Sequence, residues 1–197
     1  MEGGGQDSDL LRSQCRQGFH KFAEAAGVRG VGFVSRGGRN EAHSAFCTAL
    51  SEREMDSVVL LLVDSEEAIP EGLSNWEHLA SRHDNELRRP EGASEENLFL
   101  MVQCMETWFI ADVDCLKQRF GHGFKTTPFK EWPEFEAVPK ATVFDVLDRA
   151  TADCETSYAK GSTSFEILGL ISPERVITKC PNAARLLDRL RKHMEQN

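Results

Sequence analysis

The chain lacks the features that mark zinc-thiolate, secreted and membrane proteins. Its six cysteines are scattered and form no C-x-x-C pair, which argues against a zinc site and for reduced thiols. No apolar run approaches the roughly 20 residues of a membrane-spanning helix. The N-terminus also lacks the basic-then-apolar layout of a signal peptide. We therefore expect a cytoplasmic protein without a membrane segment.

Basic residues are also fewer than acidic residues. The 23 Lys and Arg residues are outnumbered by 32 Asp and Glu residues, which gives a formal net charge of −9. Such a balance gives no general attraction to the phosphates of nucleic acids, although it leaves room for a local basic groove or for acids that recruit a metal ion. Neither glycine turn, at residues 3–5 and 37–38, has the G-x-x-x-x-G-K-[ST] pattern, so we expect no ATP site and no bound nucleotide cofactor.

What the chain does have is an alternation of helical and strand patterns in its first half. Residues 7–26 have the apolar spacing of an amphipathic helix, and Asn40 is placed to cap a second helix. Three apolar runs, at residues 31–34, 58–63 and 98–102, predict strands, with 58–63 internal to the sheet. This order predicts an α/β fold in which a parallel sheet carries helices on both faces. Ligands bind such sheets beyond the carboxyl ends of the strands.

The second half reads as helical. Residues 104–121 predict one helix, an irregular Pro- and Gly-rich loop follows, and further helical patterns cover residues 140–153, 162–171 and 181–193. We expect an α/β core over residues 1–110 and a helical C-terminal extension over residues 111–197. The extension should pack on the core within one compact domain, because 197 residues can bury one good core.

Three carboxylates are the main candidates for chemistry. Asp64 and Glu66 follow the most apolar run, and in an extended segment residues two apart point to the same face. Glu2 stands at the lip of the first glycine turn and should reach the same edge of the sheet. Mg²⁺ or Mn²⁺ takes oxygen ligands of this kind, usually one or two carboxylates with water and substrate phosphate. The alternative is that acids at strand ends serve only solubility and helix capping.

Four further residues are candidates of lower weight. Glu106, just past the last strand, is either an added metal ligand or an acid favoured by the first turn of a helix. Arg36 and Arg39 flank the second glycine turn, where they either hold a substrate phosphate or are ordinary solvated side chains. Lys160, before Gly161, is either a partner for phosphoryl charge or a plain loop lysine.

Several motifs resemble known proteins. An acid in a glycine turn, followed two strands later by an apolar-Asp-x-acid pattern, resembles the Toprim fold of topoisomerases, bacterial primases and overcoming-lysogenization-defect (OLD) nucleases. The segments EGGGQDSDLLRSQCRQGFHKF, SRGGRN, LLLVDSEE, MVQCMETWFIAD and KGSTSFEILGLI resemble a bacterial Toprim-like family catalogued as domain of unknown function DUF4276. That resemblance covers nearly the whole chain, and its members are often encoded beside ABC-type ATPases in contexts that suggest phage defence.

The resemblance implies roles for the candidate acids. Glu2 matches the Toprim glutamate that acts as general base or acid, and Asp64 with Glu66 matches the Asp-x-Asp pair that holds Mg²⁺. The chain departs from the pattern in two ways, because the second acid of the pair is Glu and because no apolar strand precedes Glu2. We expect the second departure to reflect a start codon assigned too late, the alternative being a chain that lacks this strand.

Three functions are compatible with these residues. The first is a Mg²⁺-dependent nuclease acting on DNA or RNA, and the resemblance adds an ABC-type ATPase as its possible partner. The second is a non-catalytic scaffold or sensor subunit that docks onto such an ATPase. The third is metal-dependent action on a small nucleotide, which fits the acids without requiring a basic groove. The acidic charge balance favours the second function, and the three acids favour the first.

Overall fold

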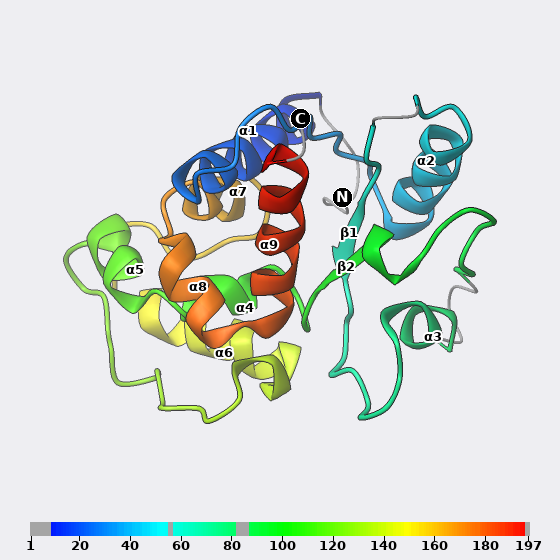
Figure 1. Cartoon of the computed structure of the whole chain (residues 1–197). Coiled ribbons are helices and arrows are strands. Elements are labelled where there is room, and N and C mark those ends of the chain that lie inside the picture. Colours follow the sequence, from blue (N-terminus) through cyan, green and yellow to red (C-terminus); the bar gives the residue numbers. More distant parts are fainter. Residues whose placement is uncertain (1–8, 55–56, 82–86, 196–197) are drawn as a thin grey trace.

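The computed structural model describes residues 9–54, 57–81 and 87–195. In these ranges the protein is a mixed α/β fold, mostly helical, built around a small sheet of two parallel strands (Figure 1). Strand β1 (Leu61–Asp64) pairs with strand β2 (Leu98–Met101), with Leu61 opposite Leu98 and Asp64 opposite Met101. Both runs are short and almost wholly apolar, as expected for strands that are covered on both faces.

The two faces of the sheet contact two different hydrophobic cores. Alternate strand residues point to opposite sides, so Leu61, Val63, Leu98 and Leu100 join a smaller core with helices α2 (Arg39–Ser51) and α3 (Asn75–Ala80). The intervening residues Leu62, Phe99 and Met101 join the larger core. Helices therefore cover both faces of the sheet, as the sequence predicts.

The larger core is formed by the helical majority of the chain. Its buried side chains run from Cys15 near the N-terminus to Leu190 near the C-terminus. The helices that supply them are α1 (Asp9–Ala25), α4 (Glu106–Ile110), α5 (Val113–Phe120), α6 (Lys140–Thr151), α7 (Ser162–Leu168), α8 (Pro173–Lys179) and α9 (Pro181–Glu195). Residues on both sides of position 110 share this core, and the division at 110 stays a prediction. None of the helices described is long and apolar enough to cross a membrane.

The strand predicted at residues 31–34 is wrong for the described part of the sheet, which contains β1 and β2 alone. Gly30, directly before this run, has a φ of 73°, so the chain enters the run from a left-handed turn. Phe33 stacks on Phe19 of α1 with ring centroids 5.8 Å apart, and the side chain of Val34 is 56% exposed. Within the described residues, the aromatic contact with α1 holds this segment, and it pairs with neither β1 nor β2.

The helix predicted over residues 104–121 is also wrong, because two helices meet there. Asp112 separates α4 from α5 and caps α5, its Oδ1 accepting a hydrogen bond of 3.2 Å from the backbone N–H of Cys115. Asn40 is likewise not a cap, since α2 begins at Arg39 after Gly38. Helices α3 and α8 were not expected. The capping box of Ser74 with Glu77 starts α3 within a segment whose composition is mostly polar.

Candidate active site

Asp64 ends strand β1 with its carboxylate held in a fixed direction. Its Oδ1 accepts a hydrogen bond of 3.0 Å from the backbone N–H of Met105, at the start of α4. Its side chain is only 14% exposed. The second carboxylate oxygen, Oδ2, faces the ammonium group of Lys140. Asp64 thus lies at the carboxyl end of the sheet, where the sequence places it.

Glu66 reaches the same edge by a route that the sequence does not predict. Its φ of 69° takes the backbone out of the extended conformation, so strand alternation does not explain where its side chain points. The turn is held by two backbone hydrogen bonds, from Ser65 N to Met101 O at 3.1 Å and from Glu66 N to Gln103 O at 2.8 Å. A left-handed, non-glycine residue of this kind is often found at functional sites.

Polar contacts with two neighbouring helices hold this turn in place. The Nε2 atom of His78, a buried residue on α3, lies 3.1 Å from the carbonyl oxygen of Ser65. The side-chain oxygen of Gln103 accepts a hydrogen bond of 3.1 Å from the backbone N–H of Lys140. The turn that carries Glu66 is therefore tied both to α3 and to the first residue of α6.

Lys140 brings a positive charge between the two acids. Its Nζ contacts Glu66 Oε2 directly and lies 3.9 Å from Asp64 Oδ2. Burial lowers the pKa of Lys140, but the hydrogen bond to Glu66 and the charges of Asp64 and Glu66 outweigh that effect and leave its pKa raised. The ammonium is therefore charged at neutral pH, and both carboxylates converge on it.

Arg39 completes this cluster of charges, whereas Arg36 does not. The Arg39 guanidinium, on the first residue of α2, is 8% exposed and lies 3.5 Å from Glu66 Oε1. Arg36 is exposed and lines a separate pocket beside the residues that lead into β1. We call Asp64, Glu66, Lys140 and Arg39 the acid–base cluster. With two negative and two positive groups it has no net formal charge.

Glu106 lies in a buried hydrogen-bond network of its own. Its Oε1 accepts a hydrogen bond of 2.8 Å from the hydroxyl of Tyr158, and that hydroxyl lies 2.9 Å from Ser164 Oγ. Burial, followed by the charges of Glu106 and Asp64, raises the pKa of the Cys104 thiol to about 12, which keeps the thiol neutral. The network joins α4 to α7 and gives Glu106 a structural partner.

Lys160 lies on the exposed surface next to α6. Its Nζ is 4.6 Å from the centre of the Phe144 ring, a cation–π contact. Phe144 is one helical turn beyond Lys140, and residues four apart share a face of a helix. Lys160 therefore lies on the side of α6 that carries Lys140, but no ion pair within the described ranges joins it to the acid–base cluster.

The third predicted acid, Glu2, lies outside the described residues. Within the described ranges, no group of three or more His, Cys, Asp or Glu side chains is placed to hold a metal ion. The pair of Asp64 and Glu66 nevertheless fits a hard cation. Both direct a carboxylate oxygen at one cationic nitrogen, and one or two carboxylates are the usual protein share of a Mg²⁺ site.

The family model for the domain of unknown function DUF4276 matches residues 1–191. The chain therefore belongs to this family. No curated protein matches the chain, and no solved structure does.

Two residues of the site are not among the candidates that the sequence offers. Lys140 stands only at the start of a helical pattern, and His78 lies in a polar stretch with no motif around it. Nothing local marks either residue, because each acts through a contact with a distant segment. The only available signal for Lys140 was its position directly after Pro139, which ends the long loop and starts α6.

Proposed function

We propose that the protein is a Mg²⁺- or Mn²⁺-dependent phosphodiesterase of nucleic acids or nucleotides. The observation that carries this proposal is the convergence of Asp64, Glu66, Lys140 and Arg39 at the carboxyl end of β1. Phosphoryl transfer needs little covalent help from a protein and depends mainly on positioning and on charge stabilisation. The cluster supplies two carboxylates, which can hold a cation, and two positively charged side chains, which can contact a phosphate.

The neutral balance of the cluster supports a role for a divalent ion. A phosphate brings negative charge, and Lys140 and Arg39 are already matched by the two carboxylates. Asp64 and Glu66, together with Glu2, would hold the ion. When bound, such an ion neutralises phosphoryl oxygens and orients the substrate. Lys140 and Arg39 are then available to donate hydrogen bonds to the phosphate.

A non-catalytic scaffold or sensor subunit is the second candidate, and one observation favours it. Each acid is already paired, Glu66 with both Lys140 and Arg39, and Asp64 with Lys140. Buried ion pairs of this kind also occur as purely structural contacts. In that case the cluster would fix α2 and α6 against the sheet, and the surface would dock a partner such as an ABC-type ATPase.

Hydrolysis assays separate these two candidates. The substrates are single- and double-stranded DNA and RNA and a chromogenic phosphodiester, each with Mg²⁺, Mn²⁺ or EDTA. We expect metal-dependent cleavage by the wild-type protein and none by Asp64→Asn, which keeps the side-chain shape and removes the charge. Asp145→Asn is the matched control, because Asp145 is an exposed acid on α6. Wild-type protein that cleaves none of these substrates with either metal would favour the scaffold.

A further inference from the structure

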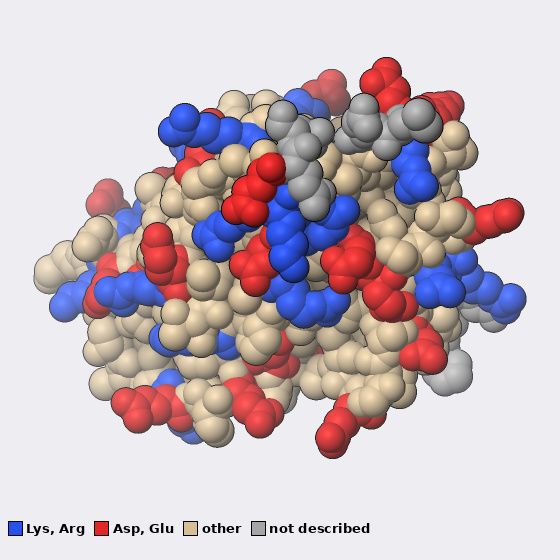
Figure 2. Space-filling view, viewed as in Figure 1, with Lys and Arg blue, Asp and Glu red and all other residues tan. Residues whose placement is uncertain are grey.

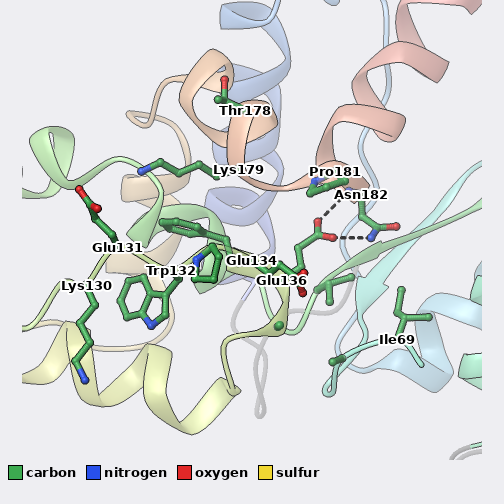
Figure 3. Close-up of a pocket in the computed structure, with 15 residues that line it drawn as sticks. Ile69, Lys130, Glu131, Trp132, Glu134, Glu136, Thr178, Lys179, Pro181 and Asn182 are labelled. Carbon is green, nitrogen blue, oxygen red and sulfur yellow. Dashed lines mark hydrogen bonds between the residues drawn. The ribbon is translucent and has the colours of Figure 1, made fainter. Parts of the chain in front are cut away.

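A large pocket is lined by segments that are close in the chain to two residues of the acid–base cluster. Its volume is about 840 Å³, within the usual range for sites that bind small molecules. Ala68 and Ile69, which follow Glu66 closely, line it on one side, and Ala137, shortly before Lys140, lines it on another. Two segments of the lining are therefore close neighbours in the chain of Glu66 and of Lys140. Figure 3 shows the residues that line the pocket.

The wall formed by residues 130–137 carries two aromatic rings. The half-buried ring of Trp132 packs edge-to-face on Phe135, with ring centroids 5.5 Å apart. Lys179 Nζ lies 4.6 Å from the centre of the Phe135 ring and donates a hydrogen bond of 2.9 Å to the carbonyl oxygen of Ala111. Trp132 is thus a partly exposed aromatic surface on a supported wall, the kind of surface on which a flat ring stacks.

Polar groups with fixed directions also line this pocket. Glu136 accepts two hydrogen bonds from Asn182, from the backbone N–H at 2.9 Å and from Nδ2 at 2.8 Å (Figure 3). Each carboxylate oxygen of Glu136 keeps further acceptor capacity. The pocket therefore combines an aromatic surface with a hydrogen-bonding edge, which matches the two recognition features of a nucleobase.

The charge of the pocket lining argues against a long polyanion. Lys130 and Lys179 are outnumbered by Glu131, Glu134 and Glu136. On the face of the molecule seen in Figure 2, basic and acidic side chains are interspersed and form no broad basic surface. A duplex presents a charge about every 1.7 Å and needs such a surface. A ligand with one or two phosphates does not.

We infer that this pocket binds the base and sugar of one unpaired nucleotide, with its phosphate directed to the acid–base cluster. This inference rests on the proposed function and narrows its substrate to a free mononucleotide or to the unpaired end of a strand. Trp132 stacks on the base, and Glu136 with Asn182 contacts the base edge. A duplex end would have to open before its last base enters.

Tryptophan fluorescence tests this inference directly. Of the three tryptophans, Trp76 is 3% exposed and Trp108 is 1% exposed, so a ligand in the pocket reports through Trp132. Adenosine and cytidine monophosphates, a single-stranded oligonucleotide and a blunt duplex of the same length, long enough to stay base-paired, are titrated both in EDTA and with Mg²⁺. We expect quenching by the monophosphates and the single strand, and at least about tenfold weaker binding of the duplex.

Direct binding by calorimetry on variants completes the test. Trp132→Ala should bind the monophosphates at least about tenfold more weakly than wild type, since stacking supplies a large share of such binding. Phe33→Ala, which removes another half-buried aromatic ring outside the pocket, should bind them as wild type does. Equal affinity of Trp132→Ala and wild type in both conditions, or equal affinity for the duplex, overturns the inference.

The outcome is separable from that of the proposed function. Asp64→Asn should lose hydrolysis but still bind the monophosphates. Adding Trp132→Ala to Asp64→Asn should weaken that binding as it does in wild type. If Trp132→Ala weakens binding but wild type hydrolyses no substrate, the nucleotide pocket is supported and the phosphodiesterase activity is contradicted. Metal-dependent hydrolysis that Trp132→Ala leaves unchanged would support the enzyme and sink the pocket.

Discussion

The Nζ atom of Lys140, on the first residue of α6, lies 3.9 Å from Oδ2 of Asp64, on the last residue of β1. The same ammonium contacts Glu66 directly. Two carboxylates this close repel each other unless a cation lies between them. In the metal-free protein, the ammonium of Lys140 lies between the two acids. A divalent ion that binds the same carboxylate oxygens therefore has to compete with it.

Competition between Lys140 and a metal ion gives the first prediction. Lys140→Met removes the ammonium and leaves Arg39, beside Glu66, as the remaining cation of the cluster, so the repulsion between the acids is only partly offset. In EDTA its free energy of unfolding should fall by about 1–3 kcal/mol, and added Mg²⁺ should stabilise it more than it stabilises wild type. Thermal unfolding with and without Mg²⁺ measures both effects, and Lys160→Met is the control. An equal or smaller metal response in Lys140→Met contradicts the competition.

The buried network of Glu106 gives the second prediction. Tyr158→Phe removes the hydroxyl that donates to Glu106, a carboxylate that is 3% exposed. Loss of a buried hydrogen bond to a charged group should lower the free energy of unfolding by about 1–3 kcal/mol in urea denaturation. The Mg²⁺ response should stay as in wild type. A lost Mg²⁺ response would instead place Glu106 among the metal ligands.

Glu136 gives a prediction on pH. Burial raises the pKa of Glu136, although the two hydrogen bonds from Asn182 act in the opposite direction. A raised pKa means that the folded protein holds this proton more tightly than the unfolded chain does. The resulting stability is present below the ordinary glutamate pKa of about 4.3 and is lost as the pH rises through the folded-state value.

Comparison with Glu136→Gln isolates this effect, because the variant cannot ionise at that position. The free energy of unfolding of wild type minus that of Glu136→Gln should fall as the pH rises from about 4 to about 7. Denaturant titrations at several pH values measure the difference. A difference that is constant or that grows with pH would contradict the assignment.

The contact between α1 and α7 gives a prediction on packing. A Cβ atom built on Gly18 would lie 2.5 Å from the carbonyl oxygen of Phe165, a backbone atom that cannot move aside cheaply. Gly18→Ala should therefore lower the free energy of unfolding by about 1–3 kcal/mol. Gly32→Ala is the matched control, since a Cβ there meets nothing within 4 Å. Equal stability of the two variants would contradict the close packing of α1 on α7.

The elements predicted best are those whose signal lies within one segment. The apolar runs at residues 58–63 and 98–102 become β1 and β2, and the amphipathic pattern at residues 7–26 becomes α1 within the described residues. The strand at residues 31–34 was wrong because an apolar run does not reveal whether its partner is a strand or a helix such as α1. The break between α4 and α5 depends on a single cap, Asp112, within a continuous helical pattern.

The candidate site shows the same limit. Asp64 and Glu66 could be selected because they lie two positions apart after the most apolar run. The left-handed turn that positions Glu66, in contrast, depends on a backbone hydrogen bond to Gln103. Lys140 is held near the acids by the hydrogen bond of its backbone N–H to the side chain of Gln103, a residue far from it in the chain. Contacts between distant segments leave no pattern in a single sequence.

The most direct test of a metal-dependent site is the effect of Mn²⁺ on the stability of the metal-free protein. We expect the ion to raise the free energy of unfolding of wild type by about 2.7 kcal/mol at a hundred times its dissociation constant. Asp64→Ala should abolish this rise, Glu66→Asp should reduce it only in part, and Asp145→Asn should leave it unchanged. Wild-type protein whose stability does not respond to Mn²⁺ or Mg²⁺, or an Asp64→Ala variant that responds as wild type does, would contradict the account.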